Sequence, residues 1–164
     1  MLISVIITTY NSPNFLRKCI DSFFFQLDKD FELIVADDGS TKETKELINE
    51  YKDSKINILH AWQKDKGFRA AKIRNEAVKI SSGKYLIFID GDCIVREDFI
   101  TNHRKIAEYG FFARGNRVML SKKFSDLILK DNININSLNI YKIIKLRLNK
   151  SINRMLPLIS FLKY

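Results

Sequence analysis

The chain reads FELIVADDGS over residues 31–40. Residues 31–36 are mostly apolar and include the β-branched Ile34 and Val35, which is typical of a strand whose two faces are both buried. The acidic pair and the glycine that follow end this strand. Ser40 and Glu43 then have the spacing of a capping box, so we expect a helix from there to about residue 51. A buried strand followed directly by a helix indicates a parallel sheet.

The same order of strand and helix is repeated on both sides of this stretch. Three further apolar runs predict strands over residues 2–9, 57–61 and 84–89. The Ser-Pro pair at residues 12–13 marks the start of a helix, and apolar spacing predicts another helix over residues 70–80. We therefore predict an α/β fold, in which a mostly parallel sheet carries helices on both faces.

The pattern is less regular in the last part of the chain. Apolar spacing predicts helices over residues 97–109 and 121–130 and short strands over residues 111–113 and 117–120. We expect two parts, a sheet-containing core at residues 1–120 and a helical basic segment at residues 121–164.

The positive charge of the chain is confined to its last third. The net charge is +9, yet residues 1–113 contain 17 Lys or Arg and 17 Asp or Glu. Residues 114–164 contain 11 Lys or Arg and only two acidic residues, Asp126 and Asp131, which gives the whole excess of +9. The neutral body and the basic end of the chain therefore call for separate explanations.

Residues 138–156 predict a basic amphipathic helix. The apolar residues on one arc are Ile140, Tyr141, Ile144, Leu148, Ile152, Met155 and Leu156, and the basic residues opposite are Arg147, Lys150 and Arg154. One interpretation is attachment to an anionic membrane surface. The alternative is a helix that docks on the core or on a second copy of the chain. The segment lacks the interleaved arginines and aromatics of nucleic-acid-binding proteins, so no nucleic acid partner is expected.

Composition excludes several classes of protein. Hydrophobic residues make up 46% of the 164 residues, which excludes global disorder. No apolar run approaches the ~20 residues of a membrane span, and the first residues do not resemble a signal peptide. Cys19 and Cys93 lack metal or redox spacing, and His60 and His103 are isolated in the sequence, so we expect free thiols and ordinary core-edge or solvated histidines. These features predict a cytoplasmic protein.

Polar residues follow each predicted strand, where parallel sheets bind their ligands. No glycine-rich phosphate loop follows the first strand, which disfavours dinucleotide-binding and P-loop enzymes. Asp90 and Asp92 stand one residue apart at the end of the fourth strand, with Gly91 between them to allow close backbone approach. Such carboxylates suit a hard cation, Mg²⁺ or Mn²⁺, that bridges the oxygens of a diphosphate. Taken alone, the tripeptide is also an ordinary turn.

The order of these motifs resembles the GT-A-fold, family 2 glycosyltransferases, in particular the bacterial capsule, lipopolysaccharide and chondroitin-polymerase-like members. The matching pieces are VIITTYN at residues 5–11, FELIVADDGS at residues 31–40, WQKDKGFRAAKIRN at residues 62–75 and IFIDGD at residues 87–92. The resemblance covers residues 1 to about 120 and identifies that part as the nucleotide-sugar-binding core.

The resemblance implies which residues contact the uridine of a donor. Thr8, Tyr10 and Asn11 match the end of the first strand, where Thr8 and Tyr10 line the uracil pocket and the Tyr10 ring stacks on the base. The alternative for Tyr10 is a half-buried ring that packs on the first helix. Asp38 matches the carboxylate that accepts a hydrogen bond from the uracil N3–H, whereas Asp37 is expected to be structural.

The resemblance also implies a phosphate and metal site. Lys66 and Arg74 match basic positions near the diphosphate, although Arg74 could instead be a solvated arginine on a helix face. Asp90 matches the first carboxylate of the D-x-D signature, near the ribose or the metal. Asp92 matches the second, which ligates the Mn²⁺ or Mg²⁺.

By this resemblance the protein is an inverting, metal-dependent glycosyltransferase. It would transfer a sugar from a nucleotide-sugar, with UDP-sugar favoured, to a glycan or lipid-linked acceptor in surface polysaccharide biosynthesis, in the cytoplasm or on the inner face of the membrane. The acidic residues beyond Asp98 are Glu108, Asp126 and Asp131, and none has the context of the family's catalytic base. We therefore expect the donor half without the acceptor half.

Two alternatives stay open. The first is a catalytically inactive nucleotide-binding or scaffold protein that associates with a membrane, a partner or a second copy through its C-terminal helix. The second is a nucleotidyltransferase, which would prefer a nucleoside triphosphate to a nucleotide-sugar.

Overall fold

The computed structural model describes residues 1–131, 133, 135, 138–155 and 158. The chain divides into two compact units, Met1–Tyr109 and Gly110–Tyr164. The expected division into a ligand-binding core at residues 1–120 and a basic segment at residues 121–164 is a division by function, and it stays a prediction.

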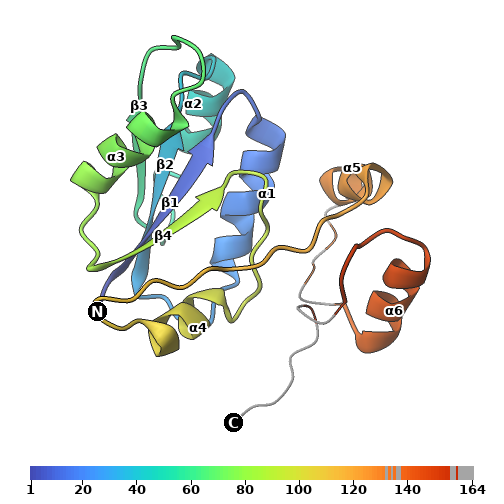
Figure 1. Cartoon of the computed structure of the whole chain (residues 1–164). Helices are drawn as coiled ribbons and strands as arrows, with labels where there is room; N and C mark the ends of the chain where they lie inside the picture. Colours follow the sequence, from blue (N-terminus) through green and yellow to red (C-terminus); the bar gives the residue numbers. More distant parts are fainter. Residues whose placement is uncertain (132, 134, 136–137, 156–157, 159–164) are drawn as a thin grey trace. The chain divides into compact units, whose positions relative to one another are not determined.

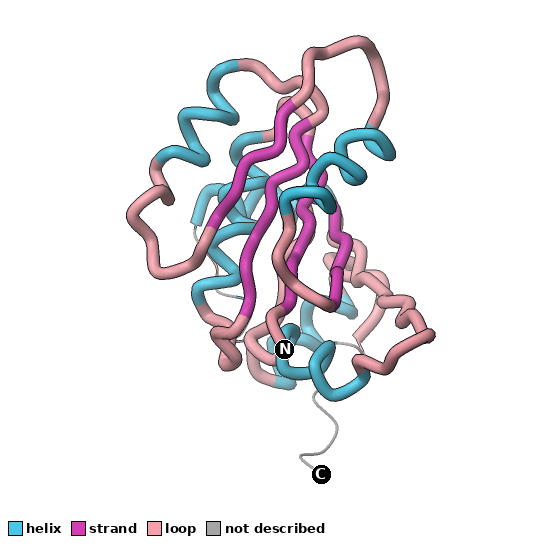
Figure 2. The backbone as a smooth tube through the Cα atoms, turned by 90° about the vertical axis from the view of Figure 1, so that its left-hand side faces the viewer, coloured by secondary structure: helices cyan, strands magenta, loops and turns pink. Residues whose placement is uncertain are grey.

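A parallel sheet forms the centre of the first unit. Its strands are β1 (Ile3–Thr9), β2 (Phe31–Asp37), β3 (Ile58–Trp62) and β4 (Tyr85–Asp90), in the order β3-β2-β1-β4. Every neighbouring pair is parallel, and Figure 2 shows the strands side by side. The predicted α/β fold and parallel sheet are confirmed, and each strand begins within one residue of its predicted start.

Helices cover both faces of this sheet, as predicted, and α1 and α3 lie on opposite sides in Figure 1. One face packs against α1 (Pro13–Phe24), α2 (Lys42–Asn49) and α4 (Phe99–Ile106), and the other packs against α3 (Ala70–Ile80). The buried side chains on the first face include Ile3, Val5, Ile7, Leu16, Ile20, Phe23, Leu47 and Ile100. Those on the α3 face are Ile6, Ile34, Ala36, Ala61, Ile73 and Ala77.

Helices α1 and α2 begin close to their predicted starts, but the predicted side-chain caps are not formed. Helix α1 does follow Ser12 with Pro13 in its first turn, yet the Ser12 hydroxyl donates to the carbonyl of Tyr10 instead of capping the helix. The capping box predicted at Ser40 is wrong, because α2 begins after Thr41 and no side chain caps it. The Ser40 Oγ instead accepts a hydrogen bond from the backbone N–H of Asn11.

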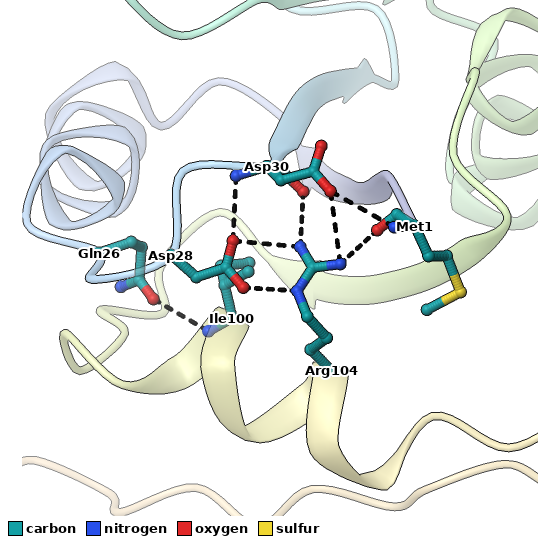
Figure 3. Close-up of polar contacts among 6 residues, drawn as sticks. All are labelled: Met1, Gln26, Asp28, Asp30, Ile100 and Arg104. Atoms are coloured by element: carbon teal, nitrogen blue, oxygen red, sulfur yellow. Dashed lines mark hydrogen bonds and ion pairs between the residues drawn. The ribbon is translucent and has the colours of Figure 1, made fainter.

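The edge of the sheet at which the strands begin, here called the amino-end edge, is held by Arg104 of α4 (Figure 3). The guanidinium donates to both carboxylate oxygens of Asp28, over 2.5 and 3.1 Å, and to the carbonyls of Met1 and Asp30. The hydrogen bonds from Arg104 hold the pKa of the Asp28 carboxyl below its usual value. The side chains of Arg104 and Asp28 are only 27% and 18% exposed, so this contact ties α4 to the start of the sheet.

A buried carboxylate lies near the same edge, on the face covered by α3. Glu32 is 2% exposed and accepts hydrogen bonds from the Ser4 hydroxyl, the Ser82 N–H and the Asn57 side chain, over 2.6, 2.6 and 3.1 Å. Ser4 Oγ in turn accepts from the N–H of Gly83 over 2.8 Å. This network connects β1 and β2 to the turn before β4.

The described part of the second unit contains two α-helices. Helix α5 (Lys122–Asp131) buries Phe124 and Ile128 and lies within one residue of the predicted helix. The short strands predicted over residues 111–113 and 117–120 are wrong, because the described segment forms only a single antiparallel bridge between Leu120 and Ile152. None of the helices described is both long and apolar enough to traverse a bilayer.

Helix α6 (Ile140–Leu148) is shorter than the helix predicted over residues 138–156. The Asn139 side chain caps its start by accepting from the N–H of Lys142 over 3.0 Å. At its end, Lys150 adopts a φ of 56°, its N–H donates to the carbonyl of Arg147, and the next N–H, of Ser151, donates to Leu146. This pair of bonds around a left-handed residue is a Schellman motif, which terminates a helix. Residue 156 of the predicted segment lies outside the described residues.

Candidate functional site

The edge at which the strands end, here called the carboxyl-end edge, brings together three of the predicted site residues. Arg74 of α3 donates from Nε to the Thr8 Oγ1 over 2.7 Å and from Nη2 to the Asp90 Oδ1 over 3.2 Å. Thr8 and Asp90 are paired in register between β1 and β4. Arg74 therefore joins the ends of two neighbouring strands while its side chain stays 37% exposed, and its predicted place near a diphosphate stays a prediction.

Gly91 lets the chain turn closely over the end of β1. Its N–H donates to the carbonyl of Thr8 over 2.8 Å, and an added Cβ would lie 3.0 Å from that same oxygen. The close backbone approach expected at Gly91 is thus present, and it fixes the position of Asp90 immediately before the turn.

Asp38 is held by two donors that the sequence analysis did not identify. Its side chain is buried, with the residue 4% exposed. The Gln63 amide donates to one carboxylate oxygen over 2.5 Å, and the backbone N–H of Arg69 donates to the other over 2.7 Å. Each oxygen can accept more than one hydrogen bond, so the carboxylate keeps acceptor capacity while its orientation is fixed.

Asp37 and His60 form a second pair beside Asp38. The buried Asp37 carboxylate accepts from the backbone N–H of Ser40 over 2.8 Å and lies 3.1 Å from the Nε2 of His60. Burial by itself raises the pKa of Asp37, but the hydrogen bonds from His60 and Ser40 outweigh it and leave the pKa below its usual value. These contacts agree with the structural role expected for Asp37. They also give His60 a partner that its isolated place in the sequence did not suggest.

The loop between β3 and α3 lies against the end of β2. Gly39 has a φ of 96°, and an added Cβ would lie 2.6 Å from backbone atoms of Asp65, so only glycine fits here. The Tyr10 hydroxyl donates to the Asp65 Oδ2 over 2.9 Å, and this bond to a carboxylate raises the pKa of Tyr10. Tyr10 is 50% exposed as a residue, so part of its side chain stays accessible.

Asn11 connects the loops that follow β1 and β2. Its backbone has a φ of 46°, and its N–H donates to the Ser40 Oγ over 2.9 Å. Its side-chain oxygen accepts from the backbone N–H of Thr41 over 2.9 Å. The structure thus gives Asn11 a positioning role in the loops, and its predicted contact with a donor stays a prediction.

Two predicted site residues are not gathered into these clusters. Lys66 is exposed in the loop between β3 and α3, and Asp92 is exposed after β4, with its carboxylate 3.6 Å from the Cys93 Sγ. Cys19 and Cys93 are both free, as predicted.

The chemistry of Asp90 and Asp92 fits a cation that a ligand helps to hold. The described residues contain no group of three or more His, Cys, Asp or Glu side chains placed to bind a metal. Mg²⁺ is commonly bound by one or two carboxylates together with substrate phosphates. The Asp90 side chain is 49% exposed, so it and Asp92 could supply those carboxylates while a diphosphate completes the coordination.

Comparison with known proteins identifies the same class of fold and domain. A family model described as glycosyl transferase family 2 matches residues 4–156. The chain is 39% identical over 108 residues to glycosyltransferase GlyA of Streptococcus pneumoniae, a match that covers 65% of this chain and 15% of GlyA. It is 38% identical over 117 residues to the UDP-Glc:alpha-D-GlcNAc-diphosphoundecaprenol beta-1,3-glucosyltransferase WfaP of Escherichia coli, covering 70% of this chain and 45% of WfaP.

The structural comparison agrees. The crystal structure of S. aureus TarS 1–349 in complex with UDP-GlcNAc superposes with a TM-score of 0.58 and 29% sequence identity, covering 64% of this chain and 30% of that chain. The chain therefore spans less than half the length of each of these three relatives.

Proposed function

Because this chain belongs to glycosyl transferase family 2, we propose that its carboxyl-end edge binds a nucleotide-sugar donor, with UDP-sugars as the donor class. The observation that carries the proposal is the bonded cluster of Thr8, Arg74 and Asp90 beside the fixed carboxylate of Asp38. Two relatives support the choice of donor, since WfaP is named for UDP-Glc and TarS was crystallised with UDP-GlcNAc.

Each residue has a role in donor binding that suits its chemistry. The exposed ring of Tyr10 offers a face on which a base can stack, and the Asp38 carboxylate can accept a hydrogen bond from a base N–H. The guanidinium of Arg74 and the ammonium of Lys66 suit the oxygens of a diphosphate. Thr8 orients Arg74 through the hydrogen bond to its Nε.

The reaction we propose is an inverting transfer. An acceptor hydroxyl attacks the anomeric carbon, the bond from that carbon to the diphosphate oxygen breaks, and the hydroxyl proton passes to a carboxylate base. When bound at Asp90 and Asp92, Mn²⁺ or Mg²⁺ would offset the charge of the departing diphosphate. The base is left unassigned, and a glycan or lipid-linked acceptor is proposed because the name of WfaP describes a lipid-linked one.

Calorimetric titration with UDP, in the presence and absence of Mn²⁺, tests the binding step. We expect binding that Mn²⁺ strengthens, and we expect Asp92→Asn to remove that strengthening. Asp53→Asn is the matched control, since Asp53 is an exposed carboxylate on the loop after α2. Absence of UDP binding under both conditions would overturn the proposal.

Release of UDP from UDP-sugars, measured with the same protein, tests the transfer step. Turnover supports a complete active site in this chain. Metal-strengthened UDP binding without turnover would favour the alternative of a nucleotide-binding protein that lacks catalysis by itself. Tighter binding of a nucleoside triphosphate than of a UDP-sugar would favour a nucleotidyltransferase.

A further inference from the structure

Helix α6 exposes apolar side chains on the face where a helix of a soluble unit usually carries polar ones. Its exposed large apolar residues are Ile140, Tyr141, Ile144 and Leu148, at 43%, 79%, 40% and 76% exposure. The residue that it buries is Ile143, at 4%. These four residues belong to the apolar arc predicted from the sequence, whereas Ile152 of that arc is buried at 2% exposure.

Helix α5 of the same unit shows the ordinary arrangement. It buries Phe124 and Ile128 and exposes lysines such as Lys122 and Lys123. Helix α5 exposes one large apolar side chain, Leu127 at 43%, whereas α6 exposes four. Elsewhere in the unit Phe111, Phe112 and Met119 are also exposed, but they do not lie on a helix. Contiguous exposed apolar surface of this kind commonly marks a site of interaction.

Basic side chains flank the apolar arc of α6. At about 100° per residue, the four exposed apolar residues fall within an arc of about 100°. Lys145 follows one border of the arc and Arg147 follows the other, and both side chains are exposed. An apolar strip with a positive rim on each side fits a surface that is apolar inside and negatively charged at its boundary.

The charge of the chain favours a lipid surface over a protein partner of neutral charge. The net charge of +9 comes entirely from residues 114–164, where α6 lies. Anionic headgroups attract such a segment, and Lys or Arg stems can extend along the surface while their heads stay in water. A helix of this length can lie in the interface without crossing the bilayer.

We propose that the apolar face of α6 (Ile140, Tyr141, Ile144 and Leu148) with its basic rim (Lys145 and Arg147) binds an anionic lipid surface. The helix lies in the headgroup plane, with the apolar strip facing the acyl chains. This binding is independent of the proposed donor site, because it uses none of the residues of the carboxyl-end edge.

Flotation of the full chain with vesicles of equimolar phosphatidylglycerol and phosphatidylcholine tests the charge requirement. We expect binding to these vesicles and little to pure phosphatidylcholine. Lys145→Glu/Arg147→Glu should weaken binding at least about tenfold. Lys45→Glu/Lys52→Glu is the matched control, because it changes the net charge equally at exposed positions of the first unit. It should weaken binding less than about threefold, since the altered charges lie outside α6.

Tyr141→Ser/Leu148→Ser tests the apolar requirement. Both side chains are more than three-quarters exposed, so the urea midpoint should stay unchanged while vesicle binding falls about tenfold. Equal binding to anionic and neutral vesicles, or an equal loss in the Lys45/Lys52 control, would overturn the proposal. So would sedimentation velocity that shows a dimer abolished by Tyr141→Ser/Leu148→Ser in a chain that does not bind vesicles, because the occupant would then be a second copy.

Discussion

The two edges of the sheet use the same pair of side-chain types in different ways. At the amino-end edge, Arg104 is enclosed by both oxygens of Asp28 and by two backbone carbonyls. At the carboxyl-end edge, Arg74 contacts Thr8 and Asp90, and the Asp90 side chain is half exposed. One arginine is committed to partners within the fold, whereas the other lies where a ligand can reach it.

The difference separates stability from binding in a way that substitutions can test. Removing one partner of an enclosed charge pair destabilises a protein strongly, because the other charge is left buried and unpaired. Exposed pairs contribute little to stability. The side chains of such a pair can therefore bind a ligand without a large cost to the fold. We therefore expect substitution of Arg104 to lower mainly the stability of the fold, and substitution of Arg74 to lower mainly the affinity for UDP.

Arg104→Met should give the largest loss of stability. Removing the guanidinium leaves the largely buried Asp28 without its main donor, and we expect the free energy of unfolding to fall by about 3 kcal/mol. Urea denaturation measures this loss. Arg17→Met is the matched control, since Arg17 also binds a carboxylate through two bonds, to Glu50, but with both side chains exposed. Its loss should stay below about 1 kcal/mol, and equal losses would remove the distinction between enclosed and exposed pairs.

Gly39→Ala should disturb the carboxyl-end edge by about 2 kcal/mol of stability and also weaken UDP binding. The added Cβ meets the backbone of Asp65, which cannot yield as a flexible side chain would. Gly67→Ala provides the control, because Gly67 has a similar positive φ of 81° but nothing within 4 Å of an added Cβ. A larger effect at Gly39 than at Gly67, in urea denaturation and in UDP titration, isolates the contact with Asp65 from backbone strain. Indistinguishable effects would mean that strain alone explains both.

Arg74→Met should show the opposite balance to Arg104→Met. We expect less than about 1 kcal/mol of lost stability, because Arg74 and Asp90 are both more than a third exposed. UDP affinity should fall at least about tenfold, which corresponds to about 1.4 kcal/mol. Calorimetry and urea denaturation of the same preparation give both values. A stable variant with unchanged UDP affinity would show that this arginine positions strand ends and does not bind the donor.

The smallest effect we predict is in the pH dependence of stability. The pKa of Asp28 is lowered in the folded protein, so its ion pair stabilises the fold above the unfolded pKa of about 3.9. That contribution is lost as pH falls through the lower, folded pKa. Between about pH 6 and about pH 3, wild-type stability should therefore decline more steeply than that of Arg104→Met, which has no pair to lose. Parallel pH profiles would contradict this assignment.

Sequence patterns predicted the sheet well because a strand that is buried on both faces consists of a continuous run of apolar residues. Residues 31–36 and 2–9 carry this signal within a few neighbouring residues, so no distant contact is needed to recognise it. The same holds for the polar strand ends, since the carboxyl-end edge of any parallel sheet collects the residues that follow its strands. Thr8 and Asp90 follow this rule, whereas Arg74 lies on a helix and was predicted from the resemblance to the glycosyltransferase family.

Contacts between loops were not predictable in the same way. Gln63 and the N–H of Arg69 bind Asp38 across 25 and 31 residues of chain, and no spacing in the sequence marks such a pair. Ser40 had the spacing of a cap, but a competing partner, the N–H of Asn11, takes its hydroxyl. Helix α6 ends early because Lys150 adopts a left-handed conformation, which the periodicity of apolar residues does not reveal.

The fixed orientation of Asp38 has a consequence for any molecule that approaches its edge of the sheet. Hydrogen bonds from Gln63 and Arg69 orient this side chain within the fold, so the entropy of ordering it is lost during folding and not during association. For the nucleotide proposed to bind here, discrimination between bases would depend on whether the base N–H meets a lone pair that these two hydrogen bonds leave open. A rigid acceptor of this kind favours selectivity over adaptability.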